Sequence, residues 1–389
     1  MPITNEADLS RLLAEGRVAA ITVDTNIFVE KGLQLNSPVL QAIASLRNRG
    51  FSFLLSGTVA QEIRRHLADA TETALRAASK AIGIALFEFE TDRPTRDALL
   101  AQISGGRSAL EAAEARFDAY VAATGCELIT DAEHVDIATI YDAYFNGEPP
   151  FGSRGKKSEF PDALALNALE RVAAGRQIAI IVVSKDGDWR SFCEKSPRLH
   201  LVADLERALT LINAAPLGLR SALETWLGEE IGREEVRARL EHAIERLEFS
   251  VSGYATSGEM EAVAWDSRLI GVEWPAEHET DIIEIKGPEH GTTKVTLSLP
   301  LLLKVRVPVE LSFSFWDNVD RESVGMGGRT IEVDEELDLR ANIDLEVRDP
   351  GGENEEITLI DVELEDGQFH EIELGSVDVF EPEDAWSGG

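Results

Sequence analysis

Acidic residues stand directly after two short apolar runs of the chain. Asp24 follows Val18–Val23 (VAAITV), and Asp186 and Asp188 follow Ile178–Val183 (IAIIVV) in the segment SKDGDW. Apolar runs of this length with many β-branched residues predict buried strands. Carboxylates at the ends of such strands can bind a divalent cation or accept protons.

Two further acids lie in the first turns of predicted helices. Glu62 belongs to SGTVAQEI, which follows the apolar run Phe51–Leu55, and Asp162 belongs to EFPDALAL, where Pro161 fits the first turn of a helix. The plain alternative for Asp162 is that its charge complements the positive end of the helix dipole. Glu62 taken alone resembles an ordinary solvated helix residue.

The elements that must position these acids alternate between strand and helix. Predicted strands are Val18–Val23, Phe51–Leu55, Ile178–Val183 and Leu199–Val202. Predicted helices are Val39–Leu46, Val59–Leu67 with an Ala-rich continuation, Ser108–Val121 and Asp162–Ala173. This alternation predicts an α/β domain with a parallel sheet covered by helices on both faces. Ligands bind such sheets beyond the carboxyl ends of the strands, so we expect the acids to converge there.

Several carboxylates gathered at one sheet edge repel one another unless a cation compensates them. Hard oxygen ligands without His or Cys suit Mg²⁺ or Mn²⁺. A metal held by a few carboxylates keeps bound water, which it can activate as a nucleophile, and it stabilises negative charge on a phosphate. The acids therefore predict metal-dependent hydrolysis.

In this arrangement the chain resembles PIN-domain nucleases. The matching segments, in chain order, are ITVDTNIF, SGTVAQEI, EFPDALAL and IIVVSKDGDW. Each segment alone is a weak signal, but four in order over the expected strands and helices are more specific. The resemblance covers roughly residues 15–212 and is nearest to larger bacterial PIN-like proteins with an FPDA-type third motif and a C-terminal extension.

The resemblance implies a PIN-like fold and a metal-dependent endonuclease, more often a ribonuclease than a deoxyribonuclease. The residues that match the family's catalytic and metal-binding acids are Asp24, Glu62, Asp162 and Asp186, with Asp188 as an accessory metal ligand. Asn26 and Ser184 match its supporting polar positions. The chain departs from small family members in a long helical insertion, residues 83–157, and in its C-terminal part.

Basic residues flank the acidic segments. Arg65 follows Glu62, Lys156 and Lys157 precede Asp162, and Lys185 precedes Asp186. As a set, these four cations are candidates to bind the phosphate backbone of a nucleic acid substrate. For any single one, a solvated charge or a surface ion pair is the more common role.

Three aromatic residues, Tyr141, Tyr144 and Phe145, precede the basic segment FGSRGKK. Aromatic rings beside a basic segment can stack on the bases of a single strand. We favour core packing for these rings and keep base stacking as the alternative.

The second part of the chain differs in charge and periodicity. Residues 1–215 carry 23 Lys and Arg against 29 Asp and Glu, a net charge of −6, whereas residues 216–389 carry 14 against 42, a net charge of −28. Apolar and polar residues alternate in Val305–Phe315 and Leu337–Val347, which predicts antiparallel strands of a sandwich or barrel. We therefore expect a PIN-like domain (1–214), a helical linker or packing helix pair (215–250), an acidic β-domain (251–381) and a flexible tail (382–389).

Composition also limits the partners and the compartment. The net charge of −34 argues against a general nucleic-acid coat protein and against binding to anionic membranes. The two cysteines, Cys126 and Cys193, are far apart and indicate a reducing cytoplasm. The chain starts without the pattern of a signal peptide and has no apolar run of membrane-spanning length.

A second class of function stays open beside the nuclease. The PIN-like domain can be a catalytically weak scaffold, with the acidic β-domain acting as a regulatory or binding module. That β-domain is a candidate surface for a protein partner or for self-association, although solubility alone also explains its charge. A toxin-like or host-defence role is an expectation from the family analogy alone.

Overall fold

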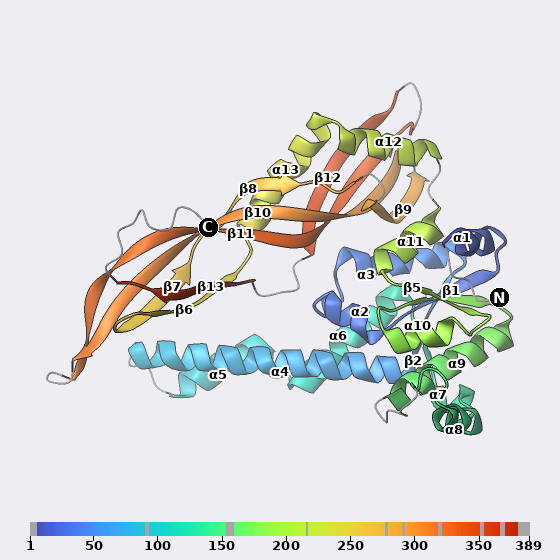
Figure 1. The fold of residues 1–389 in the computed structure, drawn as a ribbon, viewed down its shortest axis with the longest axis horizontal. Helices are drawn as coiled ribbons and strands as arrows, with labels where there is room; N and C mark the ends of the chain where they lie inside the picture. Colours follow the sequence, from blue (N-terminus) through green and yellow to red (C-terminus); the bar gives the residue numbers. More distant parts are fainter. Residues whose placement is uncertain are drawn as a thin grey trace. The chain divides into compact units, whose positions relative to one another are not determined.

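The computed structural model describes residues 6–89, 93–152, 159–214, 217–276, 279–289, 292–317, 321–350, 354–365 and 370–379 (Figure 1). Its internal contacts divide the chain into two compact units, Met1–Ala214 and Ala215–Gly389. The predicted Lys156 and Lys157 and the tail 382–389 lie outside the described residues.

A five-stranded sheet forms the centre of the first unit. Its strands are β1 (Val18–Val23), β2 (Ser52–Ser56), β3 (Glu127–Ile129), β4 (Ala179–Val183) and β5 (Leu199–Val202), in the order β3-β2-β1-β4-β5. All four neighbouring pairs are parallel, which confirms the predicted fold class. Since the chain fills one side of β1 first and then returns to β4, the direction of winding changes between β1 and β4. A ligand crevice is expected at the carboxyl ends of these two strands.

The strand β3 was not expected. It lies within residues 83–157, which the pattern predicts as a purely helical insertion, and it pairs in parallel with β2. Its three residues are too few to show a periodicity, so the insertion partly completes the sheet.

Twelve helices are described in the first unit. They are α1 (Glu6–Ala14), α2 (Thr25–Glu30), α3 (Pro38–Ala42), the 3₁₀ helix η1 (Ile43–Arg49), α4 (Gly57–Glu88), α5 (Arg93–Ser104), α6 (Ala109–Thr124), α7 (Asp131–His134), α8 (Ile137–Asn146), α9 (Phe160–Arg176), α10 (Gly187–Cys193) and α11 (Leu205–Asn213). α1 and α11 lie on one side of the strands, whereas α9 and α10 lie on the other (Figure 1). The fully buried Ile21, Leu54 and Ile181 come from the central strands.

Helix α4 is anchored to the sheet only by its first turns. The Oγ of Ser56 accepts a hydrogen bond from the backbone N–H of Val59 at 3.1 Å and caps the helix start. Val59, Ile63 and Leu67 are buried, and the later residues of the helix are partly or largely exposed. The anchored part is the part that carries Glu62.

The second unit is built on a long antiparallel hairpin. The strands β10 (Thr292–Asp317) and β11 (Glu322–Arg348) pair along their whole length. β9 (Asp281–Glu289), β8 (Arg268–Glu273) and β7 (Glu259–Ala264) pair in turn with the other edge of β10, and β12 (Glu356–Glu365) pairs with β11. This six-stranded sheet confirms the predicted antiparallel all-β region. The remaining strands, β6 (Phe249–Ala255) and β13 (His370–Val377), form a separate parallel pair, which alternation alone does not reveal.

Two helices complete the core of the second unit. α12 (Leu217–Gly228) and α13 (Glu230–Ile244) occupy the segment expected to be a linker. Val236, Leu240 and Ile244 of α13 are fully buried in one cluster with Leu303 and Ile343 of the sheet. The helices are therefore part of this unit's packing and not a free connection.

Among the described residues, no helix is both long enough and apolar enough to cross a membrane.

We predict that a fragment of residues 215–389 folds by itself, whereas a fragment of residues 251–389 does not. The shorter fragment lacks Val236, Leu240 and Ile244, and each buried side chain of this kind contributes roughly 1.5–3 kcal/mol. The longer fragment should unfold cooperatively on heating, as followed by circular dichroism. The shorter one should aggregate or melt without a transition. A monomeric, cooperatively folded 251–389 fragment would mean that 215–250 is a linker after all.

Candidate active site

The register of β1 against β4 places Asp24 beside Ser184. Val23 and Val183 are paired as the last residues of the two strands, so the next residue of each chain segment lies at the same sheet edge. The Oγ of Ser184 donates a hydrogen bond of 2.6 Å to Oδ2 of Asp24. The backbone N–H of Asp24 donates to the carbonyl of Val183 at 2.9 Å. Both side chains are buried, so the Asp24 carboxylate has a fixed position.

The hydroxyl group of Ser184 also connects two other predicted residues. It accepts hydrogen bonds from Nδ2 of Asn26 at 3.2 Å and from the backbone N–H of Asp186 at 3.0 Å. The Oδ1 of Asn26 is buried and has no hydrogen-bond partner among the described residues. Asn26 and Ser184 thus lie where supporting residues were expected, and one buried oxygen acceptor remains unused.

Glu62 is held by a residue that the motifs did not single out. The Oγ1 of Thr25 donates a hydrogen bond of 2.8 Å to Oε2 of Glu62. Thr25 directly follows Asp24 and begins α2. This bond links the acid of α4 to the end of β1.

Asp131 is a second residue that sequence analysis missed. Its carboxylate accepts hydrogen bonds from the backbone N–H groups of Gly57 at 3.1 Å and Thr58 at 2.7 Å, and from the Thr58 hydroxyl at 2.7 Å. It therefore satisfies free N–H groups at the start of α4, the helix that carries Glu62. An acid shortly after the run Glu127–Ile129 was the available signal, but that run is too short to predict as a strand.

Asp162 and Trp189 connect α9 to α10. The indole Nε1 of Trp189 donates a hydrogen bond of 2.8 Å to Oδ1 of Asp162. Trp189 is buried, so the orientation of the Asp162 carboxylate is set by a side chain that cannot move freely. Trp189 belongs to the SKDGDW segment, but its pairing with Asp162 is not visible in either segment alone.

Asp186 caps the start of α10. Its Oδ1 accepts hydrogen bonds from the backbone N–H groups of Asp188 at 2.6 Å and Trp189 at 3.2 Å. Both bonds end on the same oxygen and do not use Oδ2. Asp188 is half-buried in the first turn of the helix, and its role as a metal ligand stays a prediction.

The four main acids influence one another electrostatically. Burial raises the pKa of Asp24 to about 6; the hydrogen bond from Ser184 opposes this rise, and the charges of Asp186 and Glu62 add to it. Burial likewise raises the pKa of Asp162 to about 7, with the Trp189 hydrogen bond opposing and the charges of Asp24 and Asp186 adding to the rise. The structure therefore brings the four predicted acids, Asp24, Glu62, Asp162 and Asp186, close enough to raise the pKa values of Asp24 and Asp162 through their charges.

The donor chemistry of the site fits a hard divalent cation. All candidate ligands are oxygen atoms, which hard divalent cations prefer. No basic side chain is among the groups that shift the pKa values of Asp24 and Asp162. Asn26 also offers a buried oxygen that accepts no hydrogen bond from the described residues. The spacing is looser than in a closed metal site. Within the described part of the chain, no three His, Cys, Asp or Glu side chains form a group able to hold one ion.

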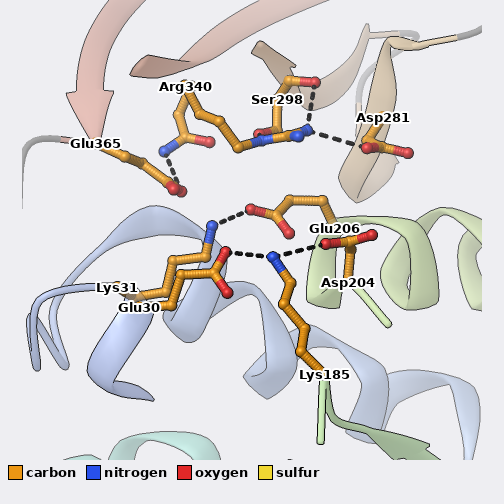
Figure 2. Close-up of polar contacts among 10 residues, drawn as sticks. Glu30, Lys31, Lys185, Asp204, Glu206, Asp281, Ser298, Arg340 and Glu365 are labelled. Atoms are coloured by element: carbon orange, nitrogen blue, oxygen red, sulfur yellow. Dashed lines mark hydrogen bonds and ion pairs between the residues drawn. The ribbon is translucent and has the colours of Figure 1, made fainter. Parts of the chain in front are cut away.

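The predicted phosphate-binding cations have different surroundings. Lys185 lies between two carboxylates, with its Nζ 2.8 Å from Oε1 of Glu30 and 3.1 Å from Oδ1 of Asp204 (Figure 2). Its charge is therefore already compensated. Arg65 projects from α4 into solvent, with its Nε 3.8 Å from Oδ2 of Asp69.

Two of the three aromatic residues on α8 are exposed, which corrects the expectation of core packing. Tyr141 is 54% exposed and Phe145 is 78% exposed. Their rings are nearly parallel, with centroids 6.4 Å apart. Only Tyr144 packs inward, with ring contacts to Phe151 at 5.3 Å and Phe160 at 5.1 Å. Since Phe160 begins α9, this packing connects the exposed rings to the helix that carries Asp162.

Comparison with protein families identifies a domain in the first unit. Residues 21–189 match the family model described as PIN domain. Residues 21–189 therefore form a PIN domain, which a C-terminal part extends, and PIN domains are generally nucleases that use divalent metal ions. No curated protein and no solved structure matches the chain.

We predict that the Asp24→Asn variant is more stable than the wild type at pH 8 in the presence of a chelator. A carboxyl group whose pKa is raised in the folded state keeps its proton there while the unfolded chain loses it, so stability falls as pH rises from about 4 to about 6. The gain at pH 8 should be about 1–3 kcal/mol and should vanish near pH 4.

Thermal unfolding of both proteins at several pH values measures this difference. The control is Asp69→Asn, which removes an exposed acid of the same kind from α4 and should give no pH-dependent gain. An equal gain at pH 4 and pH 8 for Asp24→Asn would show that the Asp24 carboxylate is not destabilised by its buried surroundings.

Proposed function

We propose that this protein is a metal-dependent endonuclease that hydrolyses phosphodiester bonds, with single-stranded RNA as its expected substrate. The observation that carries the proposal is the meeting of Asp24, Glu62, Asp162 and Asp186 at the β1–β4 switch point of a PIN domain. Four carboxylates at that place would weaken the fold if they had no function. Their presence together at this sheet edge favours catalysis over a purely regulatory scaffold.

In this proposal, Asp24, Glu62, Asp162 and Asp186 would hold Mg²⁺ or Mn²⁺, and the bound ion would supply an activated water and charge stabilisation at the phosphate. The other residues keep the carboxylates in position. The Ser184 hydroxyl orients Asp24, the Thr25 hydroxyl orients Glu62, and the Trp189 indole orients Asp162. Such fixed ligands need little reorganisation when the cation and the substrate bind.

The pKa values of the site also predict how it binds a cation. When no cation is present, Asp162 is half protonated near pH 7 and Asp24 near pH 6, because their pKa values are about 7 and about 6. Carboxylate ligands must lose their protons to bind a metal ion. Cation affinity should therefore rise steeply between about pH 6 and pH 8.

For substrate binding we assign a phosphate contact to Arg65 and base stacking to Tyr141 and Phe145. Arg65 lies one turn after Glu62 on α4, and its guanidinium group is largely exposed. The exposed rings of α8 offer flat apolar surfaces, and such surfaces bind unpaired bases with little sequence preference. Paired bases hide their faces inside a duplex, so this surface favours a single strand. The preference for RNA over DNA rests on the resemblance alone.

We predict that Asp24→Asn lowers nuclease activity by at least a hundredfold. The amide keeps an oxygen that accepts the Ser184 hydrogen bond, but it removes one negative charge from the cation site. Cleavage of a labelled RNA should require Mg²⁺ or Mn²⁺, stop with chelator, and be unaffected in Asp69→Asn.

Activity that persists at the wild-type level in Asp24→Asn would remove the assigned site. Absence of cleavage by the wild type with either metal, on both RNA and DNA, would favour the alternative of a regulatory binding module.

We predict that the double variant Tyr141→Ala/Phe145→Ala binds single-stranded RNA at least tenfold more weakly than the wild type. Stacking on one aromatic ring contributes roughly 1–3 kcal/mol per base. Fluorescence anisotropy with chelator present measures binding without cleavage. Phe87→Ala removes an equally exposed ring from α4 and serves as the control. Equal affinity of the double variant and the wild type would exclude stacking on α8.

A further inference from the structure

A cavity of about 690 Å³ opens at the amino ends of the parallel strands, opposite to the acidic site. Its lining includes Arg17, just before β1, Gln177, just before β4, and Arg198, just before β5, together with Arg11 of α1. The strand β1 has six residues, so Arg17 and Asp24 lie at opposite ends of a strand about 20 Å long. The cavity is therefore separate from the acidic site.

The lining of this cavity is basic in a strongly acidic chain. Three guanidinium groups, those of Arg11, Arg17 and Arg198, face one lining carboxylate, that of Asp8. The ion pairs of these arginines include Arg11 Nη2 to Asp8 Oδ1 at 3.0 Å, Arg11 Nε to Glu15 Oε1 at 3.9 Å, Arg17 Nη1 to Glu15 Oε2 at 3.6 Å and Arg198 Nη1 to Glu170 Oε1 at 3.3 Å. Each guanidinium group has five N–H donors, so these contacts leave most donors unused.

His200 supplies an independent indication of a ligand. It lies in β5, is 3% exposed and lines the cavity. Neither Nδ1 nor Nε2 of its ring has a hydrogen-bond partner among the described residues. Buried polar groups are almost always hydrogen-bonded, and a neutral imidazole has one donor and one acceptor to satisfy. A polar molecule in the cavity would supply the missing partner.

A neighbouring cavity also contains His200 but lacks the basic lining. It has a volume of about 340 Å³ and shares His200, but its charged lining residues are Arg190, Arg207, Glu6, Glu194 and Asp204. Two cations against three carboxylates do not attract an anion. Of the two cavities that share His200, only the larger one has a lining whose charge favours an anion.

We propose that the larger cavity binds a small phosphate monoester of nucleotide size, with Arg11, Arg17 and Arg198 holding the phosphate group and His200 hydrogen-bonded to the ligand. The guanidinium fork matches phosphate oxygens in geometry and charge. A volume of about 690 Å³ lies within the range of ligand sites and exceeds the size of one phosphate ion. The amide of Gln177 at the rim offers both a donor and an acceptor to the rest of the ligand. This site does not depend on the proposed nuclease activity.

The test uses the full chain in chelator, with calorimetry to measure the binding of adenosine 5′-monophosphate, inorganic phosphate and adenosine. We expect adenosine 5′-monophosphate to bind, phosphate to bind more weakly and adenosine not to bind. Arg17→Gln/Arg198→Gln should weaken nucleotide binding at least tenfold. Arg207→Gln, in the neighbouring cavity, and Asp24→Asn, in the acidic site, should leave it unchanged.

A second measurement needs no variant of the arginines. Burial and the charge of Arg17 lower the pKa of His200, and a bound phosphate should raise it again. The ring resonance of His200 in histidine-labelled protein, assigned with His200→Gln, should move on titration with adenosine 5′-monophosphate. No binding of either phosphate compound, binding of adenosine equal to that of its phosphate, or an unmoved His200 resonance would each overturn the proposal.

Discussion

The hydrogen bond between Ser184 and Asp24 is the contact on which the geometry of the acidic site depends. It exists because β1 and β4 end in register, and it holds a buried carboxylate at the place in the sheet where the winding direction changes. Asn26 and the backbone of Asp186 share the same hydroxyl group. A shift of one residue in the pairing of β1 with β4 would turn the Asp24 side chain to the other face of the sheet. The hydrogen bonds of the Ser184 hydroxyl with Asp24, Asn26 and the Asp186 backbone would then be lost.

Repulsion among the acids is the second constraint, and it connects structure to function. Asp24 and Asp162 have raised pKa values because they are buried and because their charged neighbours are other carboxylates. In a purely structural protein, such a cluster would be a cost without return. A bound divalent cation would compensate the repulsion between the carboxylates. The cluster that destabilises the fold without a cation therefore supports the proposed chemistry. The hydrogen bonds from Thr25 to Glu62 and from Trp189 to Asp162 keep these carboxylates oriented when no cation is bound.

Charge is distributed so that the two units present different surfaces to a polyanion. Most of the net charge of −34 belongs to residues 216–389. The first unit is close to neutral by comparison. There, one basic group, Lys185, is consumed by ion pairs with Glu30 and Asp204, while the arginines around His200 lie at the opposite edge of the sheet. The net charge of the whole chain therefore does not describe the surroundings of the acidic site or of the cavity at His200.

The sequence by itself determined the α/β class, the antiparallel region and the ends of the strands that carry Asp24 and Asp186, because burial repeats with a short period that a local pattern records. It also placed Glu62 and Asp162 in the first turns of helices, and the resemblance to PIN-domain nucleases made them candidate site residues. Only the tertiary structure decided that Asp131 caps α4, that Trp189 binds Asp162 and that α13 belongs to the sheet's core. It alone showed that Tyr141 and Phe145 are exposed and that the His200 ring has no hydrogen-bond partner within the described part of the chain. These features join segments far apart in the chain, and which segments meet is decided by strand order and register, on which local periodicity carries no information.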